Sequence, residues 1–161
     1  GSTFWVELPL SGKSPEAASI ADGATENSGG KRIAGFSGTV LYVEDNPANV
    51  QLIEVLVDRI DGLELVCAPN AEDGISLAES KAPDVILMDI NLPGMSGLEA
   101  LELLRRNGKT KNIPVIALSA AATKKDIEKG MKAGFDEYLT KPFRVEVITA
   151  TLARALKIPQ E

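Results

Sequence analysis

The sequence predicts an α/β fold with an open, doubly wound sheet of five parallel strands and helices on both faces. Five short runs rich in apolar and β-branched residues begin at intervals of about 20–30 residues, with a helical pattern between each pair. Several runs are apolar without alternation, as expected of parallel strands covered on both faces. Right-handed crossovers would place all of them in one sheet. The runs are Thr39–Val43, Leu63–Cys67, Val85–Met88, Val115–Leu118 and Glu137–Leu139.

The first helix is expected over 46–60, with Asn46 as its N-cap and Pro47 at its first position. Four apolar residues at helical spacing would form its buried stripe: Val50, Ile53, Val57 and Ile60. Three further apolar residues are expected to pack in the core, which is the commoner role, or to be exposed for docking a partner: Leu52, Val55 and Leu56. Periodicity does not decide between these two roles.

Later helices are expected at 97–106, 124–133 and 143–156. The first of these ends in two arginines, which are favourable near a helix C-terminus. Thr123 and Asp126 resemble a capping box for the second, with Asp in place of the usual Glu. The third is amphipathic. The apolar stripe of the helix at 97–106 consists of Leu98, Leu101 and Leu104.

Composition narrows the possible functions. The 161 residues suffice for one domain and some additional chain. The net charge of −6 argues against sequence-independent binding to nucleic acid or to an anionic membrane. No apolar run approaches the roughly 20 residues that span a bilayer, and the N-terminus lacks the basic start of a signal peptide. A cytoplasmic location is therefore expected, although a longer parent protein could be anchored in a membrane.

Two further counts bear on chemistry. The single cysteine, Cys67, cannot form an internal disulfide and is expected to be a small core residue in a reducing compartment. The sequence contains no His, which excludes a Ser-His-Asp triad, a His-ligated metal and a phosphohistidine within this chain. A phosphohistidine that reacts with it must lie on another segment or another protein.

Charged and hydroxyl side chains follow four of the predicted strands. The carboxyl ends of parallel strands meet at one edge of the sheet, so these side chains should converge there. Any one of them alone could be a turn former or a helix cap. Their convergence on one edge indicates a functional site. They are Glu44 and Asp45 after the first strand, Asp89 after the third, Ser119 after the fourth, and Thr140 and Lys141 after the fifth.

The three acids at this edge require a cation or a proton. Two carboxylates about 5 Å apart repel by roughly 3 kcal/mol at an effective dielectric constant of 20, so three must bind a cation or one must be protonated. Oxygen ligands with open positions suit Mg²⁺ or Mn²⁺. Lys141 would offset part of the charge. A metal held by acids beside a further carboxylate points to phosphoryl transfer, with Asp89 as the nucleophile.

Four motifs carry a family resemblance: LYVEDNPAN, VILMDINLPGMSG, IPVIALSA and GFDEYLTKPF. With them, residues 39–158 resemble the receiver domain of two-component response regulators, which has a flavodoxin-like (βα)5 fold. The resemblance implies that Asp89 is the phosphoacceptor and forms an acyl phosphate. It also implies that Asp45 is a direct Mg²⁺ ligand, that Glu44 acts largely through water, and that Asn91 lends its backbone carbonyl to the metal.

The resemblance assigns roles near the last two strands as well. Ser119 would hydrogen-bond a phosphoryl oxygen, and Lys141 would neutralise another. Tyr138 matches an aromatic switch that turns inward as Ser119 moves, although packing in a half-buried strand is an equally good account of it. Lys141–Pro142 matches a cis peptide of the family. Phosphorylation would bias the surface formed by the fourth helix, fifth strand and fifth helix.

The implied partner is a phosphohistidine on a kinase dimerisation domain or a histidine phosphotransfer protein, docking near the first helix and the site loops. One rival is a pseudo-receiver that binds partners without phosphorylation. Another is an aspartate-nucleophile phosphohydrolase, which would need a second Asp where this chain has Asn91.

The N-terminal part of the sequence suggests a larger context. Residues 1–10, GSTFWVELPL, resemble the last glycine box and terminal strand of a histidine kinase ATP-binding domain. From Ser11 to Gly38, 16 of 28 residues are Gly, Ser or Ala, which predicts a flexible linker. This order is that of a hybrid histidine kinase, a transferase whose kinase active site these 161 residues lack. A free-standing response regulator is the alternative.

Overall fold

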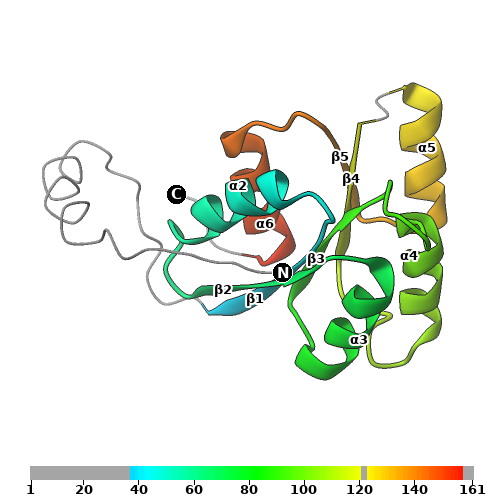
Figure 1. Cartoon of the computed structure of the whole chain (residues 1–161), viewed down its shortest axis with the longest axis horizontal. Helices are drawn as coiled ribbons and strands as arrows, with labels where there is room; N and C mark the ends of the chain where they lie inside the picture. Colours follow the sequence, from blue (N-terminus) through cyan, green and yellow to red (C-terminus); the bar gives the residue numbers. More distant parts are fainter. Residues whose placement is uncertain (1–36, 121–122, 158–161) are drawn as a thin grey trace, which may run out of the picture. The chain divides into compact units, whose positions relative to one another are not determined.

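The structure is a computed structural model that describes residues 37–120 and 123–157 (Figure 1). The predicted strand at 1–10 and nearly all of the predicted linker at 11–38 lie outside these residues. Within them, strands and helices alternate as the sequence predicts. The strands are β1 (Gly38–Val43), β2 (Leu63–Ala68), β3 (Val85–Asp89), β4 (Val115–Ser119) and β5 (Glu137–Thr140). The helices are α2 (Pro47–Val57), α3 (Ala71–Lys81), α4 (Gly97–Arg106), α5 (Lys124–Ala133) and α6 (Val145–Ala155).

All five strands are parallel and form one sheet in the order β2-β1-β3-β4-β5. The registers are regular, with Leu41 opposite Ile86 and Met88 opposite Ala117. The order reverses direction at β1, because β2 lies on one side of it and β3 on the other. A doubly wound sheet presents its functional groups at the carboxyl ends of the strands near such a reversal.

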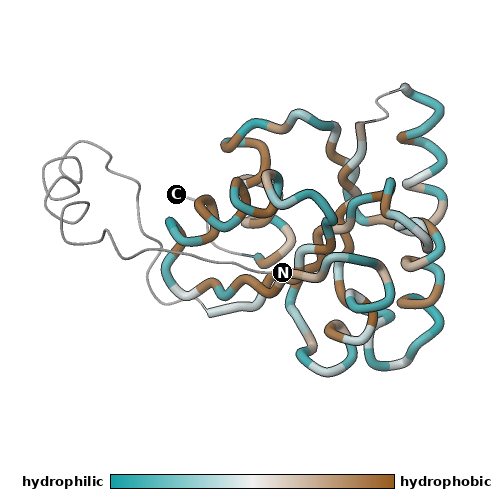
Figure 2. The backbone as a smooth tube through the Cα atoms, in the orientation of Figure 1, coloured by the Kyte–Doolittle hydropathy of each residue, from teal (hydrophilic) through white to brown (hydrophobic). Residues whose placement is uncertain are grey.

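Two apolar layers enclose the sheet. One packs α2 and α6 against one face, with Val40, Ile53 and Ile148 completely buried. The other packs α3 and α4 against the opposite face, with Leu41, Ile86 and Leu101 at its centre. Alternate residues of β1 therefore enter opposite layers, as the two-residue period of a strand requires. Figure 2 shows the apolar residues concentrated on the central strands, and Figure 1 shows the helices on both faces.

Local signals explain where the helices start. The Asn46 side chain accepts a hydrogen bond from the N–H of Ala48, with Pro47 next to it, as predicted. Thr123 caps α5 by accepting from the N–H of Asp126. No helix bounds were predicted for α3, although Asn70 accepts a hydrogen bond from the N–H of Asp73 and marks the start of this helix. The helix predicted over 46–60 ends earlier, at Val57.

Tertiary packing resolves the open question on α2. Leu56 is buried and packs in the core, whereas Leu52 is 40% exposed and Val55 is 53% exposed. Both predicted roles therefore occur on this one helix. Among the described residues, no helix combines the length and the apolar character needed to cross a membrane.

Cys67 provides a test of this packing. It lies on β2, half-buried against the layer that contains α2, and burial together with the charge of Glu54 raises its pKa to about 12. At pH 8 the native thiol should react with a disulfide reagent at least about 100-fold more slowly than the urea-unfolded chain, because the thiolate is the reactive form. A Cys67→Ala/Ser76→Cys variant carries its thiol on the exposed surface of α3 and should react quickly in both states. Equal rates for native and unfolded Cys67 would contradict the packing.

Candidate functional site

The predicted site residues converge at the carboxyl end of the sheet. Asp89 is the last residue of β3, Ser119 the last of β4, and Thr140 the last of β5. Glu44 follows β1 and still donates its N–H to the carbonyl of Ala68, at 3.0 Å. The strands β3, β4 and β5 thus each extend one residue beyond the predicted run, because the backbone ladder includes the first polar residue. The central position of β3, between β1 and β4, places Asp89 in the middle of the group.

Three carboxylates form a compact acidic cluster. Oxygens of Glu44, Asp45 and Asp89 all lie within 4.8 Å of one another. Glu44 and Asp89 are each only 3% exposed, whereas Asp45 is exposed. Like charges this close are unfavourable unless a cation or a proton compensates them. The donor set consists of hard oxygens with one side open to solvent, which fits a divalent ion such as Mg²⁺.

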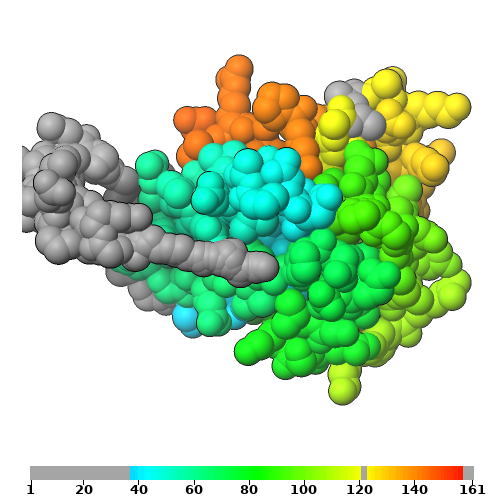
Figure 3. All heavy atoms as spheres, viewed as in Figure 1, coloured from blue at the N-terminus to red at the C-terminus, as the bar shows by residue number. Residues whose placement is uncertain are grey.

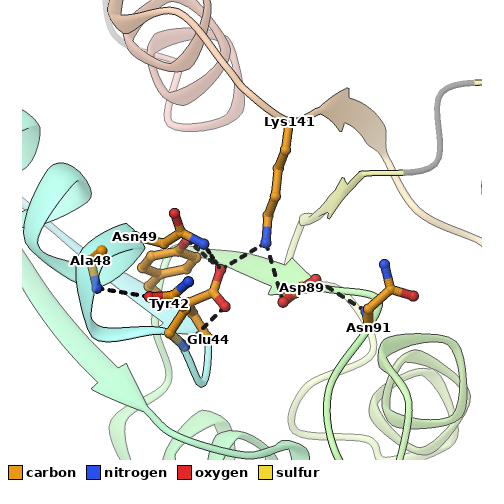
Figure 4. Close-up of polar contacts among 8 residues, drawn as sticks. Tyr42, Glu44, Ala48, Asn49, Asp89, Asn91 and Lys141 are labelled. Atoms are coloured by element: carbon orange, nitrogen blue, oxygen red, sulfur yellow. Dashed lines mark hydrogen bonds and ion pairs between the residues drawn. The ribbon is translucent and has the colours of Figure 1, made fainter.

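Lys141 connects the two buried acids (Figure 4). Its Nζ lies 2.9 Å from Oε2 of Glu44 and 3.2 Å from Oδ2 of Asp89. The backbone N–H of Lys141 also donates to the carbonyl of Ser119 at 2.8 Å, which ties the loop after β5 to the end of β4. One positive charge is therefore shared by two carboxylates and leaves the cluster with a net negative charge.

Glu44 has three further donors. Oε2 accepts from the Tyr42 hydroxyl at 3.0 Å and from the Asn49 amide at 3.1 Å, while Oε1 accepts from the N–H of Asn46 at 3.2 Å. Tyr42 and Asn49 were not among the predicted site residues. A signal was present, because residues two apart on a strand share a face, which places the Tyr42 hydroxyl beside Glu44. No similar rule of sequence spacing predicts that Asn49, on the first turn of α2, contacts Glu44, which precedes the helix.

The unequal contacts separate the pKa values of the two acids. Burial acts to raise the pKa of Glu44, but the hydrogen bond and charge of Lys141 and the N–H of Asn46 outweigh it and lower that pKa. Burial and the neighbouring charge of Glu44 raise the pKa of Asp89. Burial acts to lower the pKa of Lys141, but its contacts with both acids raise it. Burial and the charge of Glu44 raise the pKa of Tyr42, so its hydroxyl stays a donor.

The backbone after β3 is held close to Asp89. The N–H of Asn91 donates to Oδ1 of Asp89 at 3.0 Å, so Asn91 lies beside the acid as predicted. The role of the Asn91 carbonyl in binding a metal stays a prediction. Gly97 is required by a close approach, because a Cβ there would lie 2.5 Å from the Asp89 carbonyl oxygen. A side chain at this position would push α4 away from the site.

Ser119 and Tyr138 lie on the two strands at the far side of Asp89. Ser119 is buried at the end of β4. Tyr138 is half-buried on β5 opposite Ala117, and its ring lies against Gly130 of α5, where a Cβ would come within 2.7 Å of it. The Lys141–Pro142 peptide is cis. These positions are compatible with the predicted roles of Ser119 and Tyr138, which stay predictions.

The part of the chain that contains this site is similar to known proteins. The family model for the response regulator receiver domain matches residues 40–153. The chain is 38% identical over 114 residues to the polar-differentiation response regulator DivK of Brucella anthropi, covering 71% of this chain and 92% of DivK. It is 33% identical over 121 residues to the sensor histidine kinase CheAY of Helicobacter pylori, of which it spans 15%.

A solved structure is also similar. It is the receiver domain of the sensor histidine kinase PA1611 from Pseudomonas aeruginosa, with a magnesium ion coordinated in its active-site cleft. The two chains are 32% identical, the TM-score is 0.69, and the match covers 76% of this chain and 99% of that domain.

The raised pKa of Asp89 leads to a prediction about pH. Because the folded state holds the Asp89 proton more tightly than the unfolded state, ionisation of Asp89 lowers the free energy of unfolding as pH rises above the ordinary Asp pKa. In buffer without divalent cations, Asp89→Asn should be more stable than wild type at pH 7, on the order of 1 kcal/mol. The difference should shrink as pH falls through the folded-state pKa, as measured by urea unfolding.

Asp45→Asn is the matched control, because it removes an exposed carboxylate from the same cluster and should change stability less. A difference between Asp89→Asn and wild type that stays constant across this pH range would contradict the proposed repulsion.

Proposed function

The chain belongs to the response regulator receiver domain family, so it is a receiver domain of two-component systems, and from this premise we propose that Asp89 is its phosphoacceptor. The observation that carries the proposal is the buried Asp89 carboxylate at the sheet edge. An acid pair lies on one side of it, and an ammonium group lies within 3.2 Å of its Oδ2. A nucleophile, a cation-binding set and a charge-neutralising group are thus already assembled in one place.

The cation is proposed to be Mg²⁺, with Mn²⁺ as the alternative. Asp45 and Asp89 would hold it through carboxylate oxygens and Asn91 through its carbonyl. Glu44 would act through water, because both of its oxygens already accept hydrogen bonds within the protein. When bound, such an ion neutralises charge on the acids and on the transferred phosphoryl oxygens. The magnesium ion in the PA1611 receiver domain supports this assignment.

The reaction we propose is a direct transfer. An Asp89 carboxylate oxygen attacks the phosphorus of a phosphohistidine on the partner, forming the O–P bond as the P–N bond breaks. The electron pair of that bond stays on the histidine nitrogen, which leaves as a neutral imidazole when the other ring nitrogen carries the proton. Lys141 already lies beside Asp89 and would neutralise one phosphoryl oxygen. Ser119 would hydrogen-bond another and move Tyr138 inward.

The phosphohistidine partner is proposed to dock on α2. Leu52 and Val55 are exposed on this helix, which starts three residues after Glu44. Figure 3 shows α2 and the start of α6 exposed on the same face. Exposed apolar side chains next to a reaction site fit a helix of a kinase dimerisation domain or of a histidine phosphotransfer protein.

We also propose that the parent protein is a hybrid histidine kinase. The segment 1–10, which lies outside the described residues, resembles the end of a kinase ATP-binding domain. Receiver sequences similar to this one occur within CheAY and PA1611, both named as sensor histidine kinases. DivK, which this chain covers almost completely, represents the free-standing alternative.

Labelling with a small phosphodonor tests the phosphoacceptor. With acetyl phosphate and Mg²⁺, intact-mass spectrometry should show one added phosphoryl group on the wild-type chain and none after chelation of the metal. Asp89→Asn should reduce labelling at least about 100-fold, because the nucleophile is lost. Asp58→Asn, an exposed position at the end of α2, should be labelled like wild type. Undiminished labelling of Asp89→Asn would refute the assignment, and failure of the wild type to bind beryllofluoride with Mg²⁺ would favour a pseudo-receiver.

A second measurement separates docking from chemistry. Val55→Glu should leave labelling by acetyl phosphate within about twofold of wild type, because Val55 is exposed and is not part of the acidic cluster. Transfer from a phosphorylated kinase dimerisation domain or phosphotransfer protein that labels the wild type should fall about tenfold. Leu103→Glu, an exposed apolar position of α4 on the opposite face of the sheet, is the matched control and should reduce transfer less. Unchanged protein-to-protein transfer in Val55→Glu would exclude docking through this surface.

A further inference from the structure

Three donors converge on a single oxygen of Glu44. Oε2 accepts from the Tyr42 hydroxyl at 3.0 Å, the Asn49 amide at 3.1 Å and the Lys141 ammonium at 2.9 Å (Figure 4). A carboxylate has about four acceptor sites, about two on each oxygen. Three donors on one oxygen therefore exceed the number that a single carboxylate oxygen usually accepts. Two of the three are neutral and stabilise the charge of Glu44 without cancelling it. Only Lys141 brings a charge, and only Lys141 also reaches Asp89.

The Tyr42 hydroxyl is not needed to fill space. Tyr42 is completely buried within the apolar layer under α2 and α6, where a Phe ring would occupy nearly the same volume. Its hydroxyl instead emerges at the sheet edge and ends on Glu44. Asn49 is half-buried on the first turn of α2 and reaches the same oxygen from the helix side. A strand and a helix thus each supply one neutral donor to a carboxylate that is 3% exposed.

These contacts matter when Lys141 changes partner. A buried carboxylate that loses its only counter-charge is strongly destabilised unless other donors satisfy it. If Lys141 turns from Glu44 toward a phosphoryl group on Asp89, Tyr42 and Asn49 remain on Oε2 and Asn46 remains on Oε1. The neutral donors therefore make the departure of Lys141 less costly.

We propose that Tyr42 and Asn49 are positioning residues that hold the ionised Glu44 carboxylate and so release Lys141 to the phosphorylated Asp89. The inference rests on the proposed function, in which Asp89 is the phosphoacceptor and Lys141 neutralises the phosphoryl group. Neither Tyr42 nor Asn49 touches Asp89 in the described contacts. Tyr42 and Asn49 both act through Glu44. Phosphorylated Asp89 would draw Lys141 away from Glu44, so Glu44 would depend most on these two donors in that state.

The first test measures labelling by acetyl phosphate at saturating Mg²⁺. Tyr42→Phe combined with Asn49→Ala should lower the labelling rate at least about fivefold, since Lys141 is then retained by Glu44. In a Glu44→Gln background the same two substitutions should change the rate less than about twofold, because no charge remains to be held. Gln51→Ala, an exposed change two residues along α2 from Asn49, should label like wild type. Equal effects in the two backgrounds, or none in either, would overturn the proposal.

The second test uses no phosphorylation. In metal-free buffer, Lys141→Met leaves Glu44 with its neutral donors. Of the donors in the described part of the chain, Tyr42→Phe/Asn49→Ala/Lys141→Met leaves only the N–H of Asn46. The urea midpoint of this triple variant should fall by more than the sum of the shifts caused by Lys141→Met and by Tyr42→Phe/Asn49→Ala. Strict additivity would overturn the inference. Absence of labelling in the wild type would refute the proposed function instead, and the unfolding measurement would still decide this one.

Discussion

The structure of the site depends on the repulsion between Glu44 and Asp89, two buried carboxylates within 4.8 Å of each other and of Asp45. A fold that buries these charges must compensate them, and it does so incompletely, with one Lys141 ammonium for two acids. In the proposed function, the remaining negative charge would give the edge an affinity for a divalent cation and, through it, for a phosphoryl group. A fully neutralised edge would be more stable and would lack this affinity.

The parallel sheet makes the arrangement possible. Residues more than 40 positions apart in the sequence, such as Glu44 and Asp89, meet because β1 and β3 are neighbours that end at the same edge. The backbone ladder holds Asp89 at the end of a fully buried strand, and the close approach of Gly97 keeps the start of α4 beside it. Packing of the strands and helices therefore holds the acids close together despite the repulsion between their charges, as is common at functional sites.

The hydrogen-bond donors around Glu44 distinguish this acid from Asp89. Neutral donors from β1 and α2 hydrogen-bond this acid beside Lys141, so the ammonium is not its sole side-chain partner. Among the contacts of the described residues, Asp89 has fewer donors: the N–H of Asn91 on Oδ1 and the more distant contact of Lys141 on Oδ2. In the proposed function, the acid with more donors would serve as a fixed anion, and the acid with fewer would be the one whose bonding changes. This asymmetry between two similar side chains underlies the proposed phosphoacceptor role of Asp89.

Most of the fold was predictable from local patterns, because apolar runs, caps such as Asn46 and the spacing of the strands are properties of short segments. The same reasoning placed Glu44, Asp45, Asp89 and Lys141 at one edge, since parallel strands share their polarity. The exposure of Leu52 and Val55 beside a buried Leu56 was not predictable, because it depends on how α2 is turned against α6 and the sheet. The need for Gly97 and the convergence of Tyr42 and Asn49 on Glu44 were likewise decided by tertiary structure. Contacts between segments that are far apart in the sequence leave no periodic pattern in it, so they cannot be predicted from local patterns.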